Sequence, residues 1–533
     1  MQNYKVCILA AGIGARMGKL SAHANKAIFP VNFKAAISYI IEKFPAEIEI
    51  VVAVGYKKAS VIDYLAIAHP DRKITFIEID KYTGPGTGPG YSLLQCEKAI
   101  QRPFIFFSTD TIVLEDIPAP DKNWFGIASI NTPERFCTVA IEDNLICRID
   151  DKVKTDNKFA FIGAAGIYDY DVFFRSLAAD KSLICGELQV SNGFRSLIGK
   201  KLVPLKFTWF DTGTFNSYVE TNKYFSGKDS GFDFSKSDEF LYFAQGTVIK
   251  YFADADIVEK RCRRAGLLKD ICPEIIAKCN NFYAYRKVNG QILYNVLDRQ
   301  LAGSFFAWAK SRLWKRQELD ENGQRQFSAA CRNFYFNKTQ KRLRDFYEKT
   351  GLIDGENNIN GRFVPSLKRL FESIDWDYIC AGIPAVIHGD LQFDNVIVSP
   401  DEAAQCQKFR LIDWRQDFGG LTAVGDLYYD LAKLYAGMII SYQSIKRGMF
   451  SFNLDGPNVF YNYHTDNTLQ EAREEYEMFI KENGFDLPKI TIMSGLIFLN
   501  MAALHNYPFD HLLFFLGKNT IHNMVSKKCL QPN

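Results

Sequence analysis

The chain has 533 residues, of which 47% are hydrophobic and 23% are charged, as in ordinary globular proteins. This composition excludes wholesale disorder, and the length predicts two to four domains of roughly 100–200 residues each. The 64 basic and 61 acidic residues leave a net charge of +3. Because no basic excess or basic block is present, we do not expect a nucleic-acid-binding protein, whereas the small positive balance suits anionic substrates.

The 12 cysteines are scattered and no Cys-x-x-Cys pair occurs, so a zinc site is not expected. Unpaired cysteines in a chain of this length are typical of a reducing cytosol. Residues 1–10 lack the basic start and cleavage site of a signal peptide, and the apolar stretch 490–504 is too short and too polar to span a bilayer. We therefore predict a cytoplasmic protein without a membrane span, with a buried helix at 490–504. The sequence leaves the oligomeric state open.

Strand-like runs and helical stretches alternate in the first 225 residues. In chain order they are 6–9, 35–44 (helical), 50–54, 59–67 (helical), 74–77 and 104–107. Such alternation is typical of βαβ units, so it predicts an α/β domain over 1–225 with a mixed, mostly parallel, Rossmann-like sheet. Residues 226–237 are rich in Gly, Ser, Lys and Asp, which indicates a linker.

A new pattern begins at Phe240. Two strand-like runs, 241–244 and 247–252, precede a helix expected over 256–268. The remainder is mostly helical, apart from a strand–loop–strand segment at 385–414. This change of pattern predicts a second domain of a different kind.

A glycine loop, LAAGIGARMG, runs from Leu9 to Gly18 directly after the first strand-like run. Glycines let backbone N–H groups approach a phosphate, and Arg16 can neutralise its charge. Alone, such a loop is equally consistent with a tight strand-to-helix turn. The next segment, Asn25–Val31 (NKAIFPV), places Lys26 near a proline. Together the two segments resemble the signature of nucleotidyltransferases that make sugar nucleotides, CDP-choline and similar activated compounds.

This resemblance implies a nucleotide site at the glycine loop. Lys26 would bind the phosphates and stabilise the charge that develops at the α-phosphate in the transition state, with Arg16 as the second catalytic cation. The nucleotide-binding residues of the loop would be Leu9, Ala10, Ala11, Gly12 and Gly14.

Two aspartates complete the predicted front site. Asp110 follows the apolar run 104–107, and ligands of a parallel sheet bind at the carboxyl ends of its strands. The segment Trp209–Gly213 (WFDTG) resembles the family's W-x-D-x-G and supplies Asp211. Taken alone, either aspartate is explained as well by a helix cap or a turn. Taken in order with Lys26, they predict a Mg²⁺ site.

The loop Thr83–Gly90 precedes a helix expected over 91–100. Its place matches the family segment that contacts the base and ribose, so Gly84 and Gly88 are candidate nucleotide-binding residues. A rigid connecting loop is the alternative. Glu187 lies where members of the family often contact the substrate.

The segment Val386–Val398 (VIHGDLQFDNVIV) is followed by Phe409–Trp414 (FRLIDW). The pair resembles the aminoglycoside phosphotransferase and choline kinase family, in which H-G-D-x-x-x-x-N is the catalytic loop. A β-hairpin with polar turns would rarely show this spacing by chance. The resemblance implies a protein-kinase-like bilobal domain over 238–533, with a small α+β lobe (238–296) and a largely helical large lobe (297–533).

The same resemblance assigns roles to the polar residues. Asp390 would accept or orient the proton of the substrate hydroxyl, and Asn395 and Asp413 would hold Mg²⁺ on the phosphates of ATP. Lys250 would bind the phosphates of ATP. Glu259 is its candidate partner, or else a solvated residue of the helix 256–268.

Four further residues accompany this second site. Arg415 is a candidate contact of the phosphate or of the acceptor. Asp426 and Asp430 match the family's G-D-x-x-x-D-L-A segment and are expected to brace the catalytic loop. His388 is expected to pack within the loop and to transfer no proton.

Together the two resemblances imply consecutive reactions. A kinase half would use ATP to phosphorylate a small hydroxyl compound, and the front half would couple the phosphate ester to CTP or another NTP with release of pyrophosphate, with Mg²⁺ at both sites. Choline fits both families and predicts a CDP-choline-like precursor for capsule or lipopolysaccharide modification. However, choline kinases commonly carry His-Asn-Asp where this chain has His-Gly-Asp.

The identity of the acceptor and the combination of activities in the two halves stay open. An amino acid or another amino alcohol could replace choline. A sugar 1-kinase joined to a sugar-1-phosphate nucleotidyltransferase would make an NDP-sugar. In a different class of protein, one catalytic half would be accompanied by a pseudoenzyme half that senses nucleotide.

Overall fold

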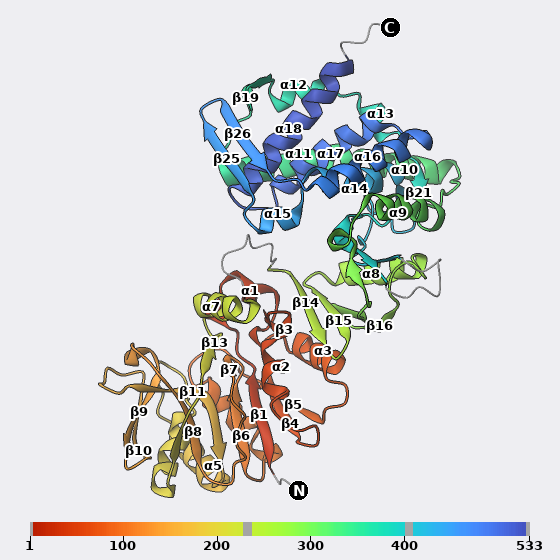
Figure 1. Cartoon of the computed structure of the whole chain (residues 1–533). Coiled ribbons are helices and arrows are strands. Elements are labelled where there is room, and N and C mark those ends of the chain that lie inside the picture. Colours follow the sequence, from red (N-terminus) through yellow and green to blue (C-terminus); the bar gives the residue numbers. More distant parts are fainter. Residues whose placement is uncertain (1–3, 228–236, 400–408, 529–533) are drawn as a thin grey trace. The chain divides into compact units, whose positions relative to one another are not determined.

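The computed structural model describes residues 4–227, 237–399 and 409–528, which form two compact units (Figure 1). The first unit contains the described residues up to 227 together with 237–255 and 277–284. The second contains 256–276 and the described residues from 285 onward. The predicted linker 226–237 lies almost wholly outside the described residues.

A mixed nine-stranded sheet forms the centre of the first unit. Its main path has the order β10-β9-β11-β6-β1-β4-β5, with β8 beside β11 and β12 beside β8. β1 pairs in parallel with β4 and β6, and β4 pairs in parallel with β5, as predicted. The strands are β1 Lys5–Ala10, β4 Ile50–Val54, β5 Ile74–Glu78, β6 Phe104–Ser108, β8 Trp124–Ser129, β9 Cys137–Glu142, β10 Leu145–Asp151, β11 Phe159–Ile167 and β12 Val203–Lys206.

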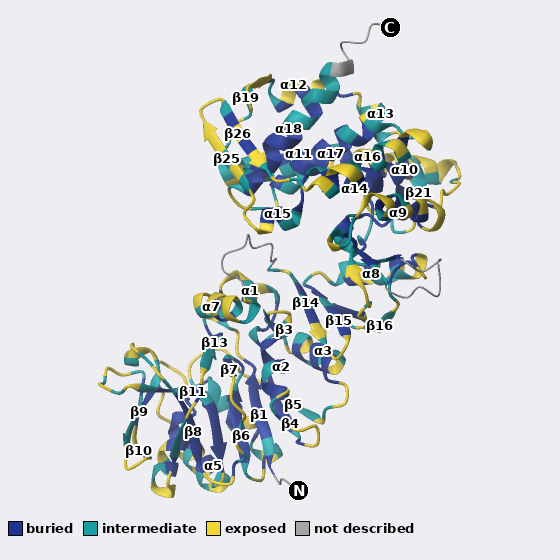
Figure 2. Ribbon diagram, in the orientation of Figure 1, coloured by how far each residue is buried: buried dark blue, intermediate teal, exposed yellow. Residues whose placement is uncertain are grey.

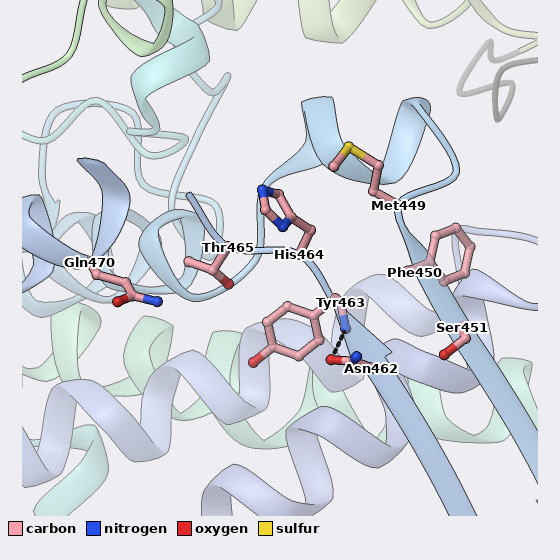
Figure 3. Close-up of a pocket in the computed structure, with 8 residues that line it drawn as sticks. All are labelled: Met449, Phe450, Ser451, Asn462, Tyr463, His464, Thr465 and Gln470. Carbon is pink, nitrogen blue, oxygen red and sulfur yellow. Dashed lines mark hydrogen bonds between the residues drawn. The ribbon is translucent and has the colours of Figure 1, made fainter. Parts of the chain in front are cut away.

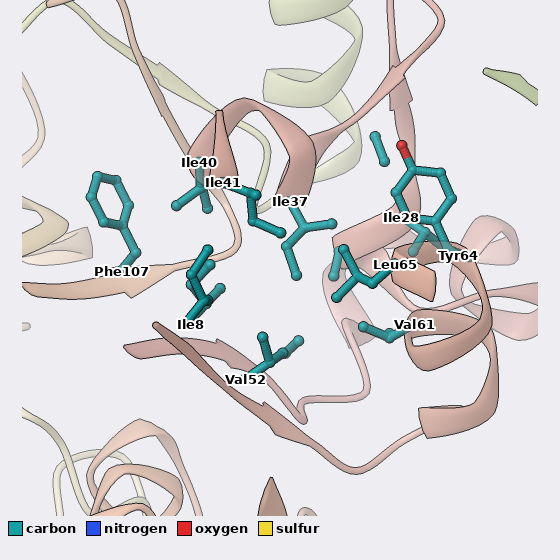
Figure 4. Close-up of a cluster of buried hydrophobic side chains, with 14 of the residues drawn as sticks. Ile8, Ile28, Ile37, Ile40, Ile41, Val52, Val61, Tyr64, Leu65 and Phe107 are labelled. Carbon is teal, nitrogen blue, oxygen red and sulfur yellow. The ribbon is translucent and has the colours of Figure 1, made fainter. Parts of the chain in front are cut away.

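Both faces of the central strands are buried (Figure 2). Ile8 of β1 packs on one face with Phe107 of β6 and Leu65 (Figure 4), whereas its neighbour Cys7 belongs to the apolar cluster of the other face. Successive strand residues point to opposite faces, so continuous apolar runs bury both sides and require helices on each. The helices of this part of the chain are α1 Lys19–His23, α2 Ala36–Ile41, α3 Lys58–Ala68, α4 Pro89–Gln95, α5 Tyr170–Ala179, α6 Ser191–Phe194 and α7 Phe215–Ser226.

Two small ladders complete this α/β region. One joins β2 (Pro30–Val31) to β3 (Lys34–Ala35). The other pairs β7 (Thr111–Val113) with β13 (Trp209–Asp211) in antiparallel fashion, with Thr111 opposite Asp211. This second ladder places Asp211 beside the end of β6.

Strands that follow the linker pack into the core of the first unit. They belong to a four-stranded sheet of order β14-β15-β17-β16, whose strands are β14 Glu239–Ala244, β15 Thr247–Phe252, β16 Ile275–Lys278 and β17 Phe282–Arg286. Tyr242 is fully buried, its ring centroid lies 4.8 Å from that of Tyr64, and its hydroxyl donates to the carbonyl of Ile28 at 2.6 Å. The predicted small lobe 238–296 is therefore divided between the two units, and the predicted domain boundaries stay a prediction.

The second unit is largely helical. α14 packs on α16 and α17, and α17 packs along α18. The apolar stretch at 490–504 is the buried helix that was predicted, and no helix among the described residues is long and apolar enough to cross a membrane. The helices are α8 Ala255–Leu267, α9 Arg299–Arg312, α10 Glu321–Arg332, α11 Lys338–Thr350, α12 Leu367–Glu372, α13 Trp376–Cys380, α14 Leu427–Ile439, α15 Tyr442–Lys446, α16 Asn467–Glu482, α17 Leu487–Ala502 and α18 Phe509–Lys528.

The second unit also contains short strands, of which β21, β22 and β23 form the predicted strand–loop–strand segment. β18, β22 and β23 form one sheet, and β21 pairs with β24. A further sheet has the order β20-β19-β26-β25. The strands are β18 Gln291–Ile292, β19 Asn357–Ile359, β20 Arg362–Val364, β21 Pro384–Ala385, β22 Val396–Val398, β23 Phe409–Leu411, β24 Gly425–Asp426, β25 Phe450–Asp455 and β26 Asn458–Tyr463.

The packing of Tyr242 predicts that Tyr242→Ala destabilises the first unit. Loss of a fully buried ring leaves a cavity and costs about 3–5 kcal/mol of the free energy of unfolding. The matched variant Tyr242→Phe keeps the ring and loses only the hydrogen bond to Ile28, for about 1 kcal/mol. Hydrogen exchange at increasing urea, read on peptides from β1 and from α17, reports each unit separately. A shift confined to α17 would show that β14 belongs with the second unit.

Candidate active sites

The glycine loop leaves the end of β1 and is tied to its neighbours by backbone atoms. Gly14 adopts a left-handed φ of +65°, which a residue with a Cβ rarely adopts. Asn25 lies buried beneath the loop and donates from Nδ2 to the carbonyls of Ala10 at 2.9 Å and Tyr56 at 2.8 Å. Tyr56 in turn donates its backbone N–H to the carbonyl of Ala11 at 2.9 Å. No sequence motif assigns Asn25 a role of its own.

Lys26 lies at the start of a short 3-10 helix, Lys26–Ile28. Asn25 caps this helix, since its Oδ1 accepts from the N–H of Ala27 at 2.9 Å. The cap aims Lys26 at the carboxyl end of β6, where its Nζ lies 2.8 Å from Oδ2 of Asp110. The structure thus brings together Lys26 and Asp110, two residues of the predicted front site.

Asp211 and Arg16 meet Asp110 at one point beside Gly213. A Cβ on Gly213 would lie 2.9 Å from Oδ1 of Asp211, 3.2 Å from Oδ2 of Asp110 and 3.5 Å from Nη2 of Arg16. The N–H of Gly213 donates to Oδ1 of Asp211 at 2.8 Å. A side chain at position 213 would therefore crowd all three groups, which explains the glycine of the WFDTG motif.

The charges of this site shift both carboxyl pKa values. Burial would raise the pKa of Asp110, but the charge and hydrogen bond of Lys26, a hydrogen bond from Ser108 and the charge of Arg16 together lower it to about 2. The pKa of Asp211 is raised by burial and by the charge of Asp110, although the N–H of Gly213 opposes the shift. Asp110 is thus ionised at neutral pH, and a positive charge placed near Asp211 would favour its ionised form as well.

Asp110 and Asp211 are the predicted ligands of a Mg²⁺ ion at this site. Among the residues that the structure describes, no group of three or more His, Cys, Asp or Glu side chains is arranged to hold a metal ion. Mg²⁺ commonly takes one or two carboxylates and fills its other positions with water and substrate phosphates. Asp110 and Asp211 therefore fit an ion that is bound together with a nucleotide, and such an ion would offset the repulsion that raises the pKa of Asp211.

The loop 83–90 lies against residues 186–188 through three backbone hydrogen bonds of 2.8 to 2.9 Å. Gly84 has a φ of +95° and Gly88 one of +114°, so both need a glycine conformation. A Cβ on Gly88 would lie 2.8 Å from Cβ of Glu187. The candidate residues Gly88 and Glu187 are therefore neighbours, and their contacts with nucleotide and substrate stay predictions.

The predicted catalytic loop of the second unit is anchored by a buried carboxylate. Asp430 of α14 accepts the N–H of His388 and the N–H of Gly389, each at 2.7 Å, and Nε1 of Trp314 donates to it at 3.2 Å. Burial raises the pKa of Asp430 to about 6, although these donors oppose the shift. The bracing role expected for Asp430 is confirmed by these contacts.

Asp390 lies next in the loop and pairs with a lysine that sequence reasoning missed. Nζ of Lys433, itself buried, lies 2.7 Å from Oδ1 of Asp390. Burial would raise the pKa of Asp390, but the charge and hydrogen bond of Lys433 outweigh it and the pKa is lowered. Nδ2 of Asn395 donates to the carbonyl of Asp390 at 2.8 Å, which fixes that amide within the same loop.

Asp413 and Arg415 join this loop from the end of β23. Asp413 adopts a left-handed φ of +60° and lies 2.5 Å from Nη1 of Arg261, an ion pair that the sequence analysis did not find. The N–H of Arg415 donates to the carbonyl of His388 at 3.0 Å. The Mg²⁺ roles predicted for Asp413 and Asn395 stay predictions.

His388 is held in one tautomer. Its Nε2 lies 2.9 Å from the carbonyl of Ile412, which can only accept, so Nε2 carries the proton. Nδ1 then accepts from the N–H of Asp390 at 3.3 Å. Burial lowers the pKa of His388 to about 4, so the ring is neutral at physiological pH and packs the loop, as predicted.

Lys250 and Glu259 fall in different compact units. Lys250 lies on β15 within the first unit, and Glu259 lies on α8 within the second. Their roles toward ATP stay predictions.

A pocket of about 540 Å³ lies apart from these residues (Figure 3). It is lined by Met449, Phe450, Ser451, Asn462, Tyr463, His464, Thr465 and Gln470. The lining residues come from the hairpin β25–β26 and the start of α16, and none of them is a predicted site residue. The predicted chemistry therefore does not use this pocket.

Comparisons with known proteins bear on the front region. No family model matches the chain. The chain is 29% identical over 229 residues to the bifunctional protein GlmU of Methanocaldococcus jannaschii. The aligned region covers 42% of this chain and 54% of that protein. It is 29% identical over 230 residues to the protein of the same name from Methanococcus vannielii, with 41% and 54% covered. The chain spans about half the length of the curated relatives it matches.

Solved structures align to a similar portion of the chain. A UDP-glucose pyrophosphorylase complexed with UDP-glucose is 19% identical with a TM-score of 0.37, over 42% of this chain and 100% of that chain. A UDP-glucose pyrophosphorylase from Acinetobacter baumannii is 14% identical with a TM-score of 0.35, over 42% and 93%.

The anchoring of the loop predicts that Asp430→Asn destabilises the second unit by about 1–3 kcal/mol, because an amide has one acceptor oxygen for two loop N–H groups. The surface variant Asp377→Asn, whose carboxylate is exposed, should change stability by less than about 0.5 kcal/mol. Urea unfolding with hydrogen exchange on the loop peptide 386–398 measures both. Equal stability of the two variants would show that Asp430 does not anchor the loop.

Proposed function

We propose that the chain is a bifunctional transferase that phosphorylates a small hydroxyl compound and then couples the phosphate ester to a nucleotide. The observation that supports it most directly is the convergence of Asp110, Asp211 and Arg16 at Gly213, with Lys26 paired to Asp110. The nucleotidyltransferase motifs single out these four residues from distant parts of the sequence. The similarity of the front region to GlmU proteins agrees with the nucleotidyltransferase half.

In the front reaction a phosphate oxygen of the ester attacks the α-phosphorus of an NTP. The bond from that phosphorus to the bridging oxygen breaks, and pyrophosphate leaves with its electron pair. Lys26 and Arg16 stabilise the negative charge that builds on the α-phosphate, since both cations lie beside the carboxylates of the site. Asp110 and Asp211 would hold Mg²⁺, which supplies further charge neutralisation when bound.

In the back reaction the acceptor hydroxyl attacks the γ-phosphorus of ATP, the bond to the β–γ bridging oxygen breaks, and ADP leaves. Asp390 accepts or orients the hydroxyl proton; its pKa is lowered by Lys433, so it is ionised and able to accept a hydrogen bond. Asn395 and Asp413 would hold Mg²⁺, which would neutralise charge on the phosphates of ATP.

The nucleotide and the ester define the product. CTP with a choline-like ester would give a CDP-choline-like precursor for surface polysaccharides. The second candidate is a sugar 1-phosphate with an NDP-sugar as product, because the front motifs resemble enzymes of both kinds. Glu187, next to Gly88, would contact the ester in either case.

The two-site proposal predicts separable losses. Asp390→Asn should lower ATP-dependent phosphorylation by about 10²–10⁴-fold and spare pyrophosphate release from a supplied phosphate ester. Asp110→Asn, which keeps the shape of the side chain, should lower pyrophosphate release by about 10²–10³-fold and spare phosphorylation.

Mass spectrometry of products and an enzymatic pyrophosphate assay measure both activities on the purified chain, across CTP, UTP, GTP and dTTP. Asp377→Asn serves as the control, since its exposed carboxylate lies outside both sites. Loss of both activities in either variant, with folding intact, would contradict two independent sites. Retention of phosphorylation in Asp390→Asn would remove that residue from the kinase reaction.

A further inference from the structure

Two cations lie against one aromatic ring beside the catalytic loop of the second unit. Phe334 is buried in the π-helical turn Asn333–Asn337 between α10 and α11, and Nζ of Lys338 lies 3.9 Å from its ring centroid. The guanidinium carbon of Arg415 lies 5.1 Å from the same centroid. Cations pack favourably on aromatic faces, so Phe334 fixes the positions of both charges.

Arg415 is coupled directly to the loop that contains Asp390. Its N–H donates to the carbonyl of His388, and a Cβ on Gly389 would lie 2.7 Å from Cβ of Arg415. Gly389 has a φ of +85°, so the loop can pass this close to Arg415 only with a glycine. This contact gives a reason for His-Gly-Asp in place of His-Asn-Asp: a larger residue would displace Arg415 from the loop.

Lys433 and Arg342 extend the set, and we call the four residues Lys338, Arg342, Arg415 and Lys433 the basic cluster. Lys433 pairs with Asp390 at 2.7 Å. Arg342 lies one turn after Lys338 on α11, so both project from the same side of that helix. Through Lys433, which pairs with Asp390, and Arg415, which is hydrogen-bonded to the neighbouring residue His388, the cluster reaches the aspartate that would receive the substrate hydroxyl.

The basic cluster has more positive charge than its surroundings neutralise. Lys338 has its pKa lowered well below the usual value, first by burial and then by the charges of Arg415, Arg342 and Lys433, while the charge of Asp390 opposes the shift. Within the described ranges, no carboxylate lies within salt-bridge distance of Lys338, Arg342 or Arg415. Nε of Arg415 is buried and, in the same ranges, has no hydrogen-bond partner. Buried charges and donors are costly unless a partner satisfies them.

We propose that the acceptor of the kinase half bears an oxyanion, a carboxylate or a phosphate, which the basic cluster binds while the hydroxyl of the same molecule faces Asp390. This inference rests on the proposed kinase function and specifies its substrate class. An oxyanion satisfies the Arg415 donor and separates the crowded cations. A cationic acceptor such as choline is repelled by the same charges, so a hydroxy acid or a phosphorylated alcohol replaces it as the substrate class.

Phosphorylation of a matched set of probes tests the substrate class. The full chain is assayed with ATP and Mg²⁺, without other nucleotides, against glycerate, glycerol 3-phosphate, glycerol and choline. We expect kcat/KM for at least one anionic probe to exceed the values for glycerol and choline by about tenfold or more. A preference for choline or glycerol would leave the kinase proposal standing and overturn the oxyanion inference.

Lys338→Gln tests the cluster itself, and Lys341→Gln, an exposed residue of the same helix, is its matched control. In Lys338→Gln we expect KM for the anionic probe to rise about tenfold while KM for ATP stays within about twofold. Lys341→Gln should leave both constants unchanged. A rise in KM for ATP alone would assign the basic cluster to the γ-phosphate of ATP and overturn the inference.

A binding measurement covers the case in which none of the four probes is phosphorylated. With Mg²⁺ and a non-hydrolysable ATP analogue present, malonate or inorganic phosphate should raise the melting temperature of the wild-type chain more than that of Lys338→Gln. Equal shifts in the two proteins would overturn the oxyanion site. Failure of the ATP analogue itself to stabilise the chain would instead count against the proposed kinase function.

Discussion

An ion pair between a lysine and an aspartate lies at the centre of each candidate site. Lys26 lies 2.8 Å from Asp110 in the first unit, and Lys433 lies 2.7 Å from Asp390 in the second. In both pairs burial would raise the carboxyl pKa and the lysine lowers it, so each carboxylate is ionised although its side chain is only partly exposed to water. Much of the surrounding structure serves to hold these pairs: strand ends, a helix cap, backbone donors and glycines of positive φ. Removing either partner would leave a buried charge without compensation.

The front site was largely predictable because its residues follow from chain topology. β1 and β6 are parallel neighbours, so the glycine loop and Asp110 must emerge at the same edge of the sheet. The apolar runs predicted these strands, and the motifs identified Lys26 and Asp211. The short pairing of β7 with β13 was not predicted, because three residues per strand give no readable period. The motifs predicted that the two carboxylates share a site, but the close approach of Arg16 and both carboxylates at Gly213 depends on that pairing and could not be inferred.

In the second site, local sequence patterns predicted the loop residues but not the residues that pair with them. The loop residues Asp390, Asn395 and Asp413 follow from their motifs, but the partners Lys433 and Arg261 depend on how distant helices pack. Lys433 sits within an apolar helix, where periodicity indicates burial and says nothing of a buried charge. Similarly, the composition of 226–237 indicated a break in the chain, yet it could not show that β14 and β15 join the earlier core. An apolar strand joins the core whose surface is complementary to its own side chains. For β14 that surface includes Tyr64, which contacts Tyr242.

The chain passes from the first unit to the second after residue 255, returns at 277 and leaves again after 284. This path constrains how the two units can be exchanged between proteins by recombination. A recombination event at the 226–237 junction would separate Tyr242 and Phe282 from the apolar surface that they cover. The front half of one such protein can thus be exchanged for that of another only if the donor segment continues through residue 284, or if the recipient strands already match the new surface. Substitutions at Tyr64 and Tyr242 should accordingly be correlated among related proteins, although the two residues lie on opposite sides of segment 226–237.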